Sequence, residues 1–124
     1  MRILLVVTAA SEAPTGLALL LLPSMVVSLL LGATLDTPSE PVVARVAGAA
    51  LLALGTACWL ARNDQQSAAV KGLIAALLVY NAAAVAVLVY AAYGLARSGI
   101  GLWPAIIVHV ALAVWCVACL RIKK

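Results

Sequence analysis

The chain has 124 residues, of which 67% are hydrophobic and only 10% are charged. Soluble domains carry about 25% charged residues, so this composition excludes a water-exposed globular surface. Four helices of about 20 residues with short loops use nearly the whole length. The net charge of +4 resides mostly at the ends of apolar runs, which argues for membrane orientation and against a nucleic-acid partner. We therefore expect one all-α domain over residues 1–124, a four-transmembrane-helix bundle in a lipid bilayer.

The first predicted span runs from about Ile3 to Leu22. It weakly imitates a secretory signal peptide, but its first apolar run is short and Glu12 and Pro14 follow, so we expect a retained helix. Pro23 ends this span. The apolar stretch from Ser24 to Leu31 is too short to cross a bilayer, so we expect a short interfacial helix or hairpin there.

Three further spans follow a loop predicted at residues 36–41, which is rich in proline and acidic residues. The second span covers about Val42 to Ala61, and the third covers about Ala69 to Leu95. The fourth covers about Leu102 to Leu120, with Pro104 in its first turn, where the missing N–H of proline costs nothing.

Basic residues predict the orientation. Four spans place both termini, and the connection between the second and third spans, on the same side of the membrane. Six basic residues lie on that side and two on the other, so the positive-inside rule predicts a multi-pass protein of the bacterial inner membrane with both termini in the cytoplasm. The six are Arg2, Arg62, Lys71, Arg121, Lys123 and Lys124, and the two are Arg45 and Arg97.

The second span carries small residues at helical spacing. Gly48 and Gly55 share a face, so we expect a neighbouring helix to approach closely there. The segments Arg45-Val-Ala-Gly48 and Gly55-Thr-Ala-Cys58-Trp59-Leu-Ala-Arg62 resemble the second helix of small uncharacterised four-helix membrane proteins of proteobacteria, and more distantly that of DoxX-like proteins. This resemblance extends over most of the chain. It implies a membrane location and a four-helix fold, and it implies no reaction or cofactor.

Polar side chains within the spans are the sharpest functional signal, because such groups are rare in a bilayer. Glu12 and Asn81 lie about 13 Å and about 18 Å from the inner ends of their helices, and His109 lies about 11 Å from the outer end of its helix. The three therefore reach a similar depth, and Arg45 could extend inward toward them. The candidate ligand-binding or proton-coupling residues are Glu12, Arg45, Asn81 and His109.

Of these residues, Glu12 costs the most free energy to place in a membrane, since an acidic group at the centre of a span raises the free energy of insertion by about 2.5–3.5 kcal/mol. We expect its face, with Thr8, Thr15 and Gly16, to point into the bundle. Pro14 leaves the carbonyl of Ala10 without its helical donor, a feature that transporters use in discontinuous helices. Two interpretations stay open. Either the carboxyl locks the fold, protonated or paired with Arg45 or His109, or it binds a ligand or a proton.

The sequence gives little support for a metal, haem or catalytic site. His109 is the only histidine and cannot supply two axial haem ligands. Cys58, Cys116 and Cys119 lack the second pair that a strong metal motif needs, so we expect structural thiols and no metal or cofactor. The sequence contains no Gly-rich phosphate loop, no nucleophile with a histidine nearby and no acidic cluster for magnesium, so we predict no catalytic residues.

The leading interpretation is a non-enzymatic membrane protein. It binds a lipid or a small apolar molecule at a polar-lined core, or serves as an accessory component of a membrane assembly, with a membrane protein or a second copy as partner. The alternative is a small proton-coupled transporter that works as a dimer, with Glu12 as the coupling carboxyl. Small multidrug transporters resemble this chain in length, helix number and a Glu in the first helix, although the first helix here has no aromatic residue. The six-to-two charge bias argues against a dual-orientation dimer.

Overall fold

The computed structural model describes residues 1–64 and 67–121, and in these ranges the chain forms five helices and no strand. The helices are α1 (Arg2–Leu21), α2 (Pro23–Leu31), α3 (Ser39–Ala61), α4 (Ala68–Gly94) and α5 (Leu102–Arg121). All except α2 are long and apolar enough to cross a membrane. The protein is therefore a small multi-pass membrane protein with the predicted all-α, four-span fold. Lys123 and Lys124, which contribute to the predicted orientation, lie outside the described residues.

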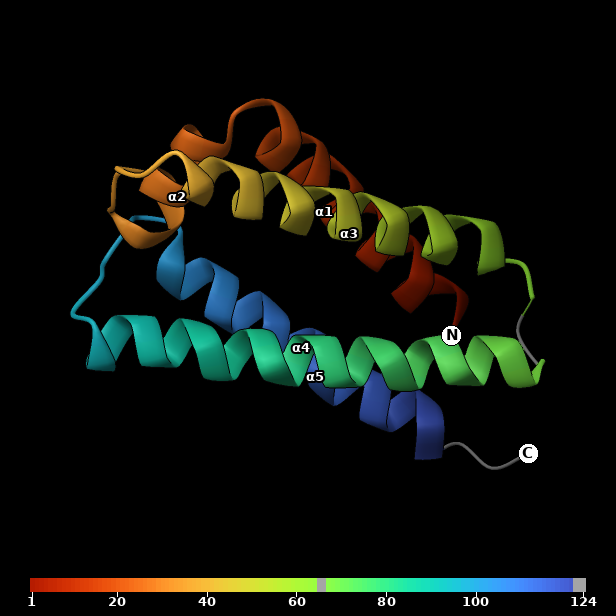
Figure 1. The fold of residues 1–124 in the computed structure, drawn as a ribbon. Coiled ribbons are helices and arrows are strands. Elements are labelled where there is room, and N and C mark those ends of the chain that lie inside the picture. The colour runs from red at the N-terminus through yellow and green to blue at the C-terminus, as the bar shows by residue number, and fades with distance from the viewer. Residues whose placement is uncertain (65–66, 122–124) are drawn as a thin grey trace.

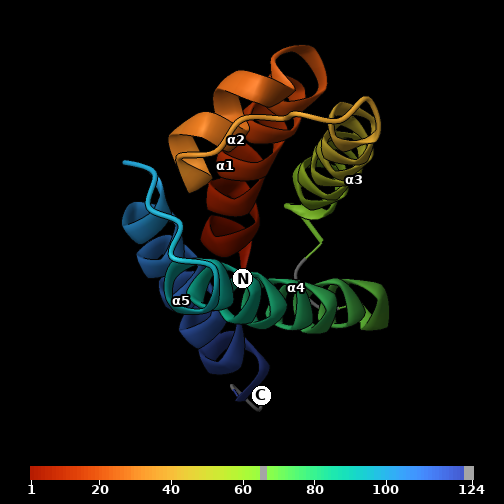
Figure 2. The same ribbon diagram turned by 60° about the vertical axis from the view of Figure 1, so that its left-hand side comes forward.

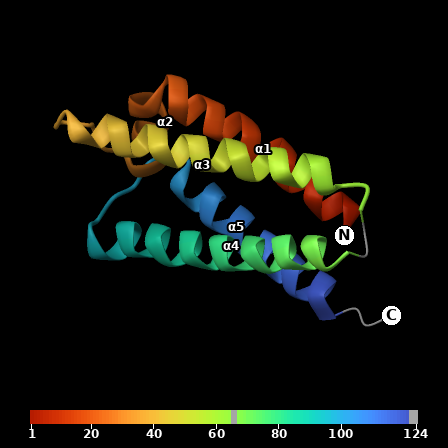
Figure 3. The same cartoon turned by 45° about the vertical axis from the view of Figure 1, so that its right-hand side comes forward.

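The four long helices form two pairs. α1 packs mainly on α3, and α4 packs mainly on α5, so that one pair lies above the other in Figures 1 and 3. The short helix α2 lies at one end of the molecule, in contact with both α1 and α5. The N-terminus and the end of α5 lie at the opposite end, where α3 ends and α4 begins (Figure 1).

Glycines bring α1 and α3 into backbone contact. A Cβ added at Gly16 would lie 2.5 Å from the backbone nitrogen of Leu52, and one at Gly48 would lie 2.7 Å from the carbonyl oxygen of Gly16. One at Gly55 would lie 2.8 Å from the backbone nitrogen of Ala13. The close approach predicted at Gly48 and Gly55 is confirmed, and α1 is the helix that makes it.

The start of α3 differs from the prediction by three residues. The helix begins at Ser39 and not at Val42, so the expected loop at residues 36–41 is shorter. The Glu40 carboxylate accepts hydrogen bonds from the backbone N–H groups of Asp36 (2.6 Å) and Thr37 (3.1 Å), which fixes the entry into the helix. Pro41 lies in the first turn, where a helix makes no use of the N–H that proline lacks.

The short helix predicted between the first two spans is confirmed as α2. It follows a break at Leu22, where Pro23 starts the new helix, and it ends at Gly32 in the left-handed conformation (φ 62°). The loop between α4 and α5 packs against it. Gly101 donates its N–H to the Leu29 carbonyl at 2.8 Å, and a Cβ at Gly99 would collide with the Leu29 carbonyl oxygen. α2 is thereby held against the start of α5.

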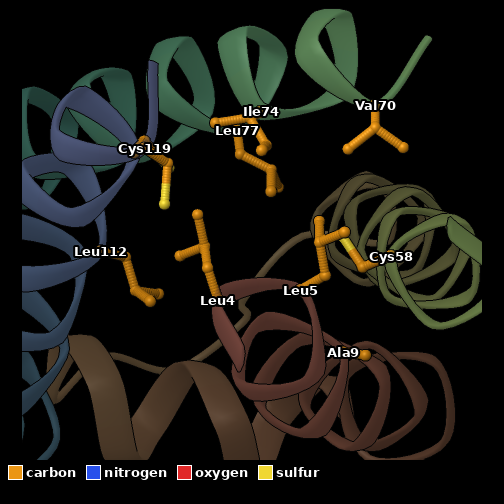
Figure 4. Close-up of a cluster of buried hydrophobic side chains, with 10 residues drawn as sticks. Leu4, Leu5, Ala9, Cys58, Val70, Ile74, Leu77, Leu112 and Cys119 are labelled. Carbon is orange, nitrogen blue, oxygen red and sulfur yellow. The ribbon is translucent and has the colours of Figure 1, made fainter. Parts of the chain in front are cut away.

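Two apolar clusters form the core. The larger one gathers side chains from α1, α3, α4 and α5 near the N-terminus (Figure 4). In that view Leu4 points toward α4 and α5, whereas Leu5 lies beside Cys58 and Val70. The smaller cluster joins α4 and α5 to the end of α2, and its buried members are Leu88, Leu102 and Ile106.

Candidate functional site

A polar layer separates the two apolar clusters. On α4, Tyr80 and Asn81 follow the last residue of the larger cluster, Leu77, and precede Leu88 of the smaller one. On α5, His109 lies between members of the two clusters in the same way, and on α1, Glu12 follows Ala9. Figure 2 shows the N-terminal half of α1 reaching the α4–α5 pair, while α3 lies alongside α1. The polar residues therefore meet where the two helix pairs meet.

Glu12 is buried in this layer, with 4% of its surface exposed. The hydroxyl of Tyr80 donates a hydrogen bond to its Oε2 atom at 3.3 Å. This is the one hydrogen bond that the carboxyl makes to the described residues, and none of their basic side chains forms an ion pair with it. This distance exceeds the usual range of about 2.5–3.0 Å for a hydrogen bond between two oxygens, so the contact is weak. The carboxyl retains acceptor capacity that the protein itself leaves unused.

Tyr80 also contacts His109. Their rings meet edge to face, with centroids 5.5 Å apart and planes inclined by 81°. His109 in turn lies 2.8 Å from Asn81, between the Nδ1 and Oδ1 atoms, and the Asn81 amide nitrogen donates to the Leu77 carbonyl at 2.7 Å. A chain of contacts thus runs from Glu12 through Tyr80 and His109 to Asn81.

The Asn81 contacts determine which nitrogen of His109 carries the proton. Because the amide nitrogen donates to a carbonyl, the atom that faces His109 is the amide oxygen, which can only accept. His109 Nδ1 must then be the N–H donor. In the neutral ring, Nε2 is left as an acceptor.

Thr8 adds an unsatisfied hydroxyl one turn before Glu12. Its side chain is fully buried, and its Oγ1 atom has no hydrogen-bond partner among the described residues. A buried hydroxyl without a partner costs about 1–3 kcal/mol. Thr15, which we expected on the same inward face, is exposed and donates to the Ser11 carbonyl. The inward polar face of α1 is therefore shorter than predicted and consists of Thr8 and Glu12.

Arg45 lies apart from the other three candidates. Its side chain is exposed, and its Nε atom donates to the Leu20 carbonyl at 3.1 Å. Leu20 is eight residues beyond Glu12, which corresponds to about 12 Å along α1. The structure thus brings Glu12, Asn81 and His109 together, with Tyr80 as their link. Arg45 of α3 lies instead beside the end of α1.

Tyr80 is the site residue that sequence reasoning missed. Its signal was its position, because tyrosine in membrane proteins concentrates at the two interfaces and Tyr80 lies beside Asn81, mid-way along its span. The exposed Tyr90 and Tyr93 near the end of α4 fit the interfacial pattern. A tyrosine away from the interface needs a polar partner for its hydroxyl, and here the partner is Glu12.

The three cysteines belong to the larger apolar cluster, where all are buried and free. Within residues 1–64 and 67–121, no group of three His, Cys, Asp or Glu side chains is placed to hold a metal ion. The chemistry that the site offers is therefore that of a carboxyl, a phenol and an imidazole. Together they can accept and donate hydrogen bonds and can exchange protons.

Comparison with known proteins adds no assignment, because no family model, curated protein or solved structure matches this chain.

Proposed function

We propose that this protein is a non-enzymatic binding protein of the bacterial inner membrane, with both termini in the cytoplasm. Its ligand is a lipid or another small molecule with an apolar body and a hydrogen-bonding head, and the head binds at Glu12. The observation that carries this proposal is the unused hydrogen-bonding capacity at Glu12. Among the residues that the structure describes, the carboxyl makes one long hydrogen bond, and the hydroxyl of Thr8, one turn away on the same helix, has no partner.

The cost of these groups supports the proposal. A carboxyl without a cation is expensive in hydrocarbon, and an unsatisfied hydroxyl adds to that expense. A chain that needed only helix packing at this depth could place Leu or Ala at both positions. A ligand head that donates to Glu12 and contacts Thr8 would satisfy both groups together.

The position of the layer also supports it. The site lies where the α1–α3 pair meets the α4–α5 pair, and pockets for small molecules are commonly lined by facing helices of a bundle. The contacts within each pair are far more extensive than those between pairs. A ligand can therefore enter by separating the pairs slightly, with the glycine contacts between α1 and α3 left intact.

The test is the identity of what copurifies. Wild-type protein and the variants Glu12→Leu and Thr15→Val are purified in mild detergent, and bound small molecules and lipids are measured by mass spectrometry. We expect a stoichiometric molecule in the wild type, its loss in Glu12→Leu, and its retention in Thr15→Val, which changes an exposed hydroxyl of the same helix. Equal occupancy in all three proteins, or none in the wild type, contradicts the proposal.

Proton-coupled transport is the second candidate, and one observation favours it. Two titratable side chains, Glu12 and His109, are linked through Tyr80 across the boundary between the helix pairs. Tyr80 also supplies, from α4, the aromatic neighbour that α1 lacks. In liposomes with an imposed pH gradient, Glu12→Gln should then abolish gradient-driven uptake of the copurified molecule while leaving its binding measurable. Unchanged uptake in Glu12→Gln excludes this candidate.

An accessory role in a membrane assembly predicts a different result. In that case a stoichiometric membrane protein copurifies, and Glu12→Leu has no effect on its recovery. The same mass-spectrometry experiment records proteins as well as lipids, so it separates this role from ligand binding.

A further inference from the structure

A second site lies at the other end of α1, where it meets α2 and α3. An open pocket of about 490 Å³ is formed there by Leu22, Pro23, Ser24 and Met25 at the α1–α2 junction and by Pro41 and Arg45 of α3. Its wall is mostly apolar, with one cation and one hydroxyl. This pocket is separate from Glu12 and plays no part in the function proposed above.

The guanidinium of Arg45 is held in place at this pocket. Its Nε atom donates to the Leu20 carbonyl at 3.1 Å. Because α1 breaks at Leu22 and Pro23 begins a new helix, the last carbonyls of α1 lack helical donors, and Arg45 satisfies one of them. The terminal nitrogens of the guanidinium still carry N–H donors, in a planar arrangement that suits two oxygens of a phosphate.

The charge of Arg45 has no counter-ion among residues 1–64 and 67–121. In the described part of the chain it forms no ion pair. The acids at this end of the molecule have other partners, since Asp36 accepts from the Thr34 hydroxyl at 2.7 Å and Glu40 accepts from backbone N–H groups. An arginine in or near hydrocarbon requires a compensating anion or access to the interface.

Depth identifies the source of that anion. Arg45 lies six residues beyond Ser39, about 9 Å along α3. The 23 residues of α3 span about 34 Å, slightly more than a hydrocarbon core of about 30 Å. The Arg45 backbone therefore lies about 7 Å inside the hydrocarbon core. Its guanidinium bonds to Leu20, the second-last residue of α1, so it reaches toward the head groups, where lipid phosphates are concentrated. The apolar wall suits the upper part of an acyl chain.

We propose that this pocket binds the phosphate group of an anionic phospholipid, with the Arg45 guanidinium as its ligand and Ser24 beside it. The glycerol and the first carbons of the acyl chains lie against Leu22, Met25 and Pro41. The bound lipid contacts both the end of α1 and the start of α2, so it bridges the point at which the helix is interrupted.

Native mass spectrometry in a non-ionic detergent tests the proposal with three probes. These are phosphatidylglycerol, a diacylglycerol with the same acyl chains but no phosphate, and inorganic phosphate as competitor. We expect one phosphatidylglycerol to bind about tenfold more tightly than the diacylglycerol, as a charge-assisted hydrogen bond predicts. Inorganic phosphate at millimolar concentration should not displace it. Equal binding of the two lipids overturns the proposal, and displacement by inorganic phosphate assigns the pocket to a soluble anion instead.

Two variants test the residues. Arg45→Gln should lower the affinity for phosphatidylglycerol about tenfold, but it also removes the hydrogen bond to Leu20 and can weaken the fold. Ser24→Glu leaves that hydrogen bond in place and puts a negative charge in the pocket, so it should lower the affinity to a similar extent.

The matched controls are Arg97→Gln and Ser98→Glu, which make the same substitutions in the exposed loop after α4. Both should bind phosphatidylglycerol as the wild type does. Wild-type affinity in Ser24→Glu, or an equal loss of affinity in the controls, contradicts the assignment. Because Glu12 is unchanged in all four variants, their results do not depend on the function proposed for that residue.

Discussion

At the scale of single residues, Tyr80 is the link on which the polar layer depends. Of the described residues it alone donates a hydrogen bond to the Glu12 carboxyl, and its ring contacts His109. We expect Tyr80→Phe to keep the ring contact and to remove the long hydrogen bond to the buried carboxyl, which costs about 0.5–1.5 kcal/mol of folding free energy. Reversible unfolding in mixed micelles measures this difference. Tyr93→Phe, at a residue that is 76% exposed, is the control and should match the wild type. Equal stability of both variants rules out a stabilising role for the Glu12–Tyr80 hydrogen bond.

His109 offers a spectroscopic test, because it is the only histidine in the chain. Its contact with the Asn81 oxygen requires the proton of the neutral ring to reside on Nδ1. Nitrogen-15 chemical shifts of histidine-labelled protein should therefore show a protonated Nδ1 and an unprotonated Nε2. In Asn81→Leu the acceptor is lost, and we expect the population to move toward the Nε2-protonated form. A wild-type ring protonated on Nε2 contradicts the geometry.

At the scale of helices, the α1–α3 contact makes a prediction with a built-in control. A Cβ at Gly48 would lie 2.7 Å from a backbone oxygen of α1, whereas one at Gly72 of α4 meets nothing within 4 Å. Gly48→Ala should force the two helices apart and destabilise the protein by about 1–3 kcal/mol. Gly72→Ala should be neutral or stabilising by up to about 1 kcal/mol, since Ala favours helix over Gly. Detergent unfolding curves compare the two, and equal effects would refute the close contact.

The helices themselves were largely predictable, and their pairing was not. Long apolar runs ended by Pro23 or by the Asn63–Asp64 segment define spans from local sequence alone. The spacing of Gly48 and Gly55 predicts a close contact with another helix. It does not predict that the partner is α1, because the two contacting surfaces are far apart in sequence. Glu12, Asn81 and His109 share a depth that counting residues reveals. The role of Tyr80 could not be predicted in this way. It depends on how α4 is rotated relative to α1, and counting residues along a span gives the depth of a side chain but not that rotation.

Arg45 is a second residue whose contact with another helix could not be predicted from the sequence. Its length and charge made Glu12 a plausible partner, but the break at Pro23 exposes backbone carbonyls at the end of α1, and the guanidinium bonds to one of them. A sequence shows that a helix ends at a proline. It does not show which side chain from another helix will satisfy the carbonyls left there.

At the scale of the whole molecule, the contacts that hold the helices together are separate from the polar layer between the two helix pairs. Backbone contact makes α1 and α3 one unit, and the short loop held on α2 ties α5 to the same end of the molecule. Between the pairs, the polar layer with Glu12 has apolar clusters on both sides. Within the layer Glu12 and Asn81 are buried, whereas Tyr80 and His109 are partly exposed at the side of the bundle.

The orientation of the whole molecule in the membrane is the last prediction. Both described ends of the chain lie at one end of the bundle (Figure 1). The described basic residues at that end are Arg2, Arg62, Lys71 and Arg121, against Arg45 and Arg97 toward the other end. The positive-inside rule then predicts that this end faces the cytoplasm. A reporter enzyme active only in the periplasm, fused after Lys124, should be inactive, and the same reporter inserted between Asp36 and Glu40 should be active. The insertion interrupts the hydrogen bond between these two residues, so an insertion after Arg97 serves as a second site on the same face. Activity from the C-terminal fusion alone would reverse the orientation, and the Arg45 pocket would then face the inner leaflet.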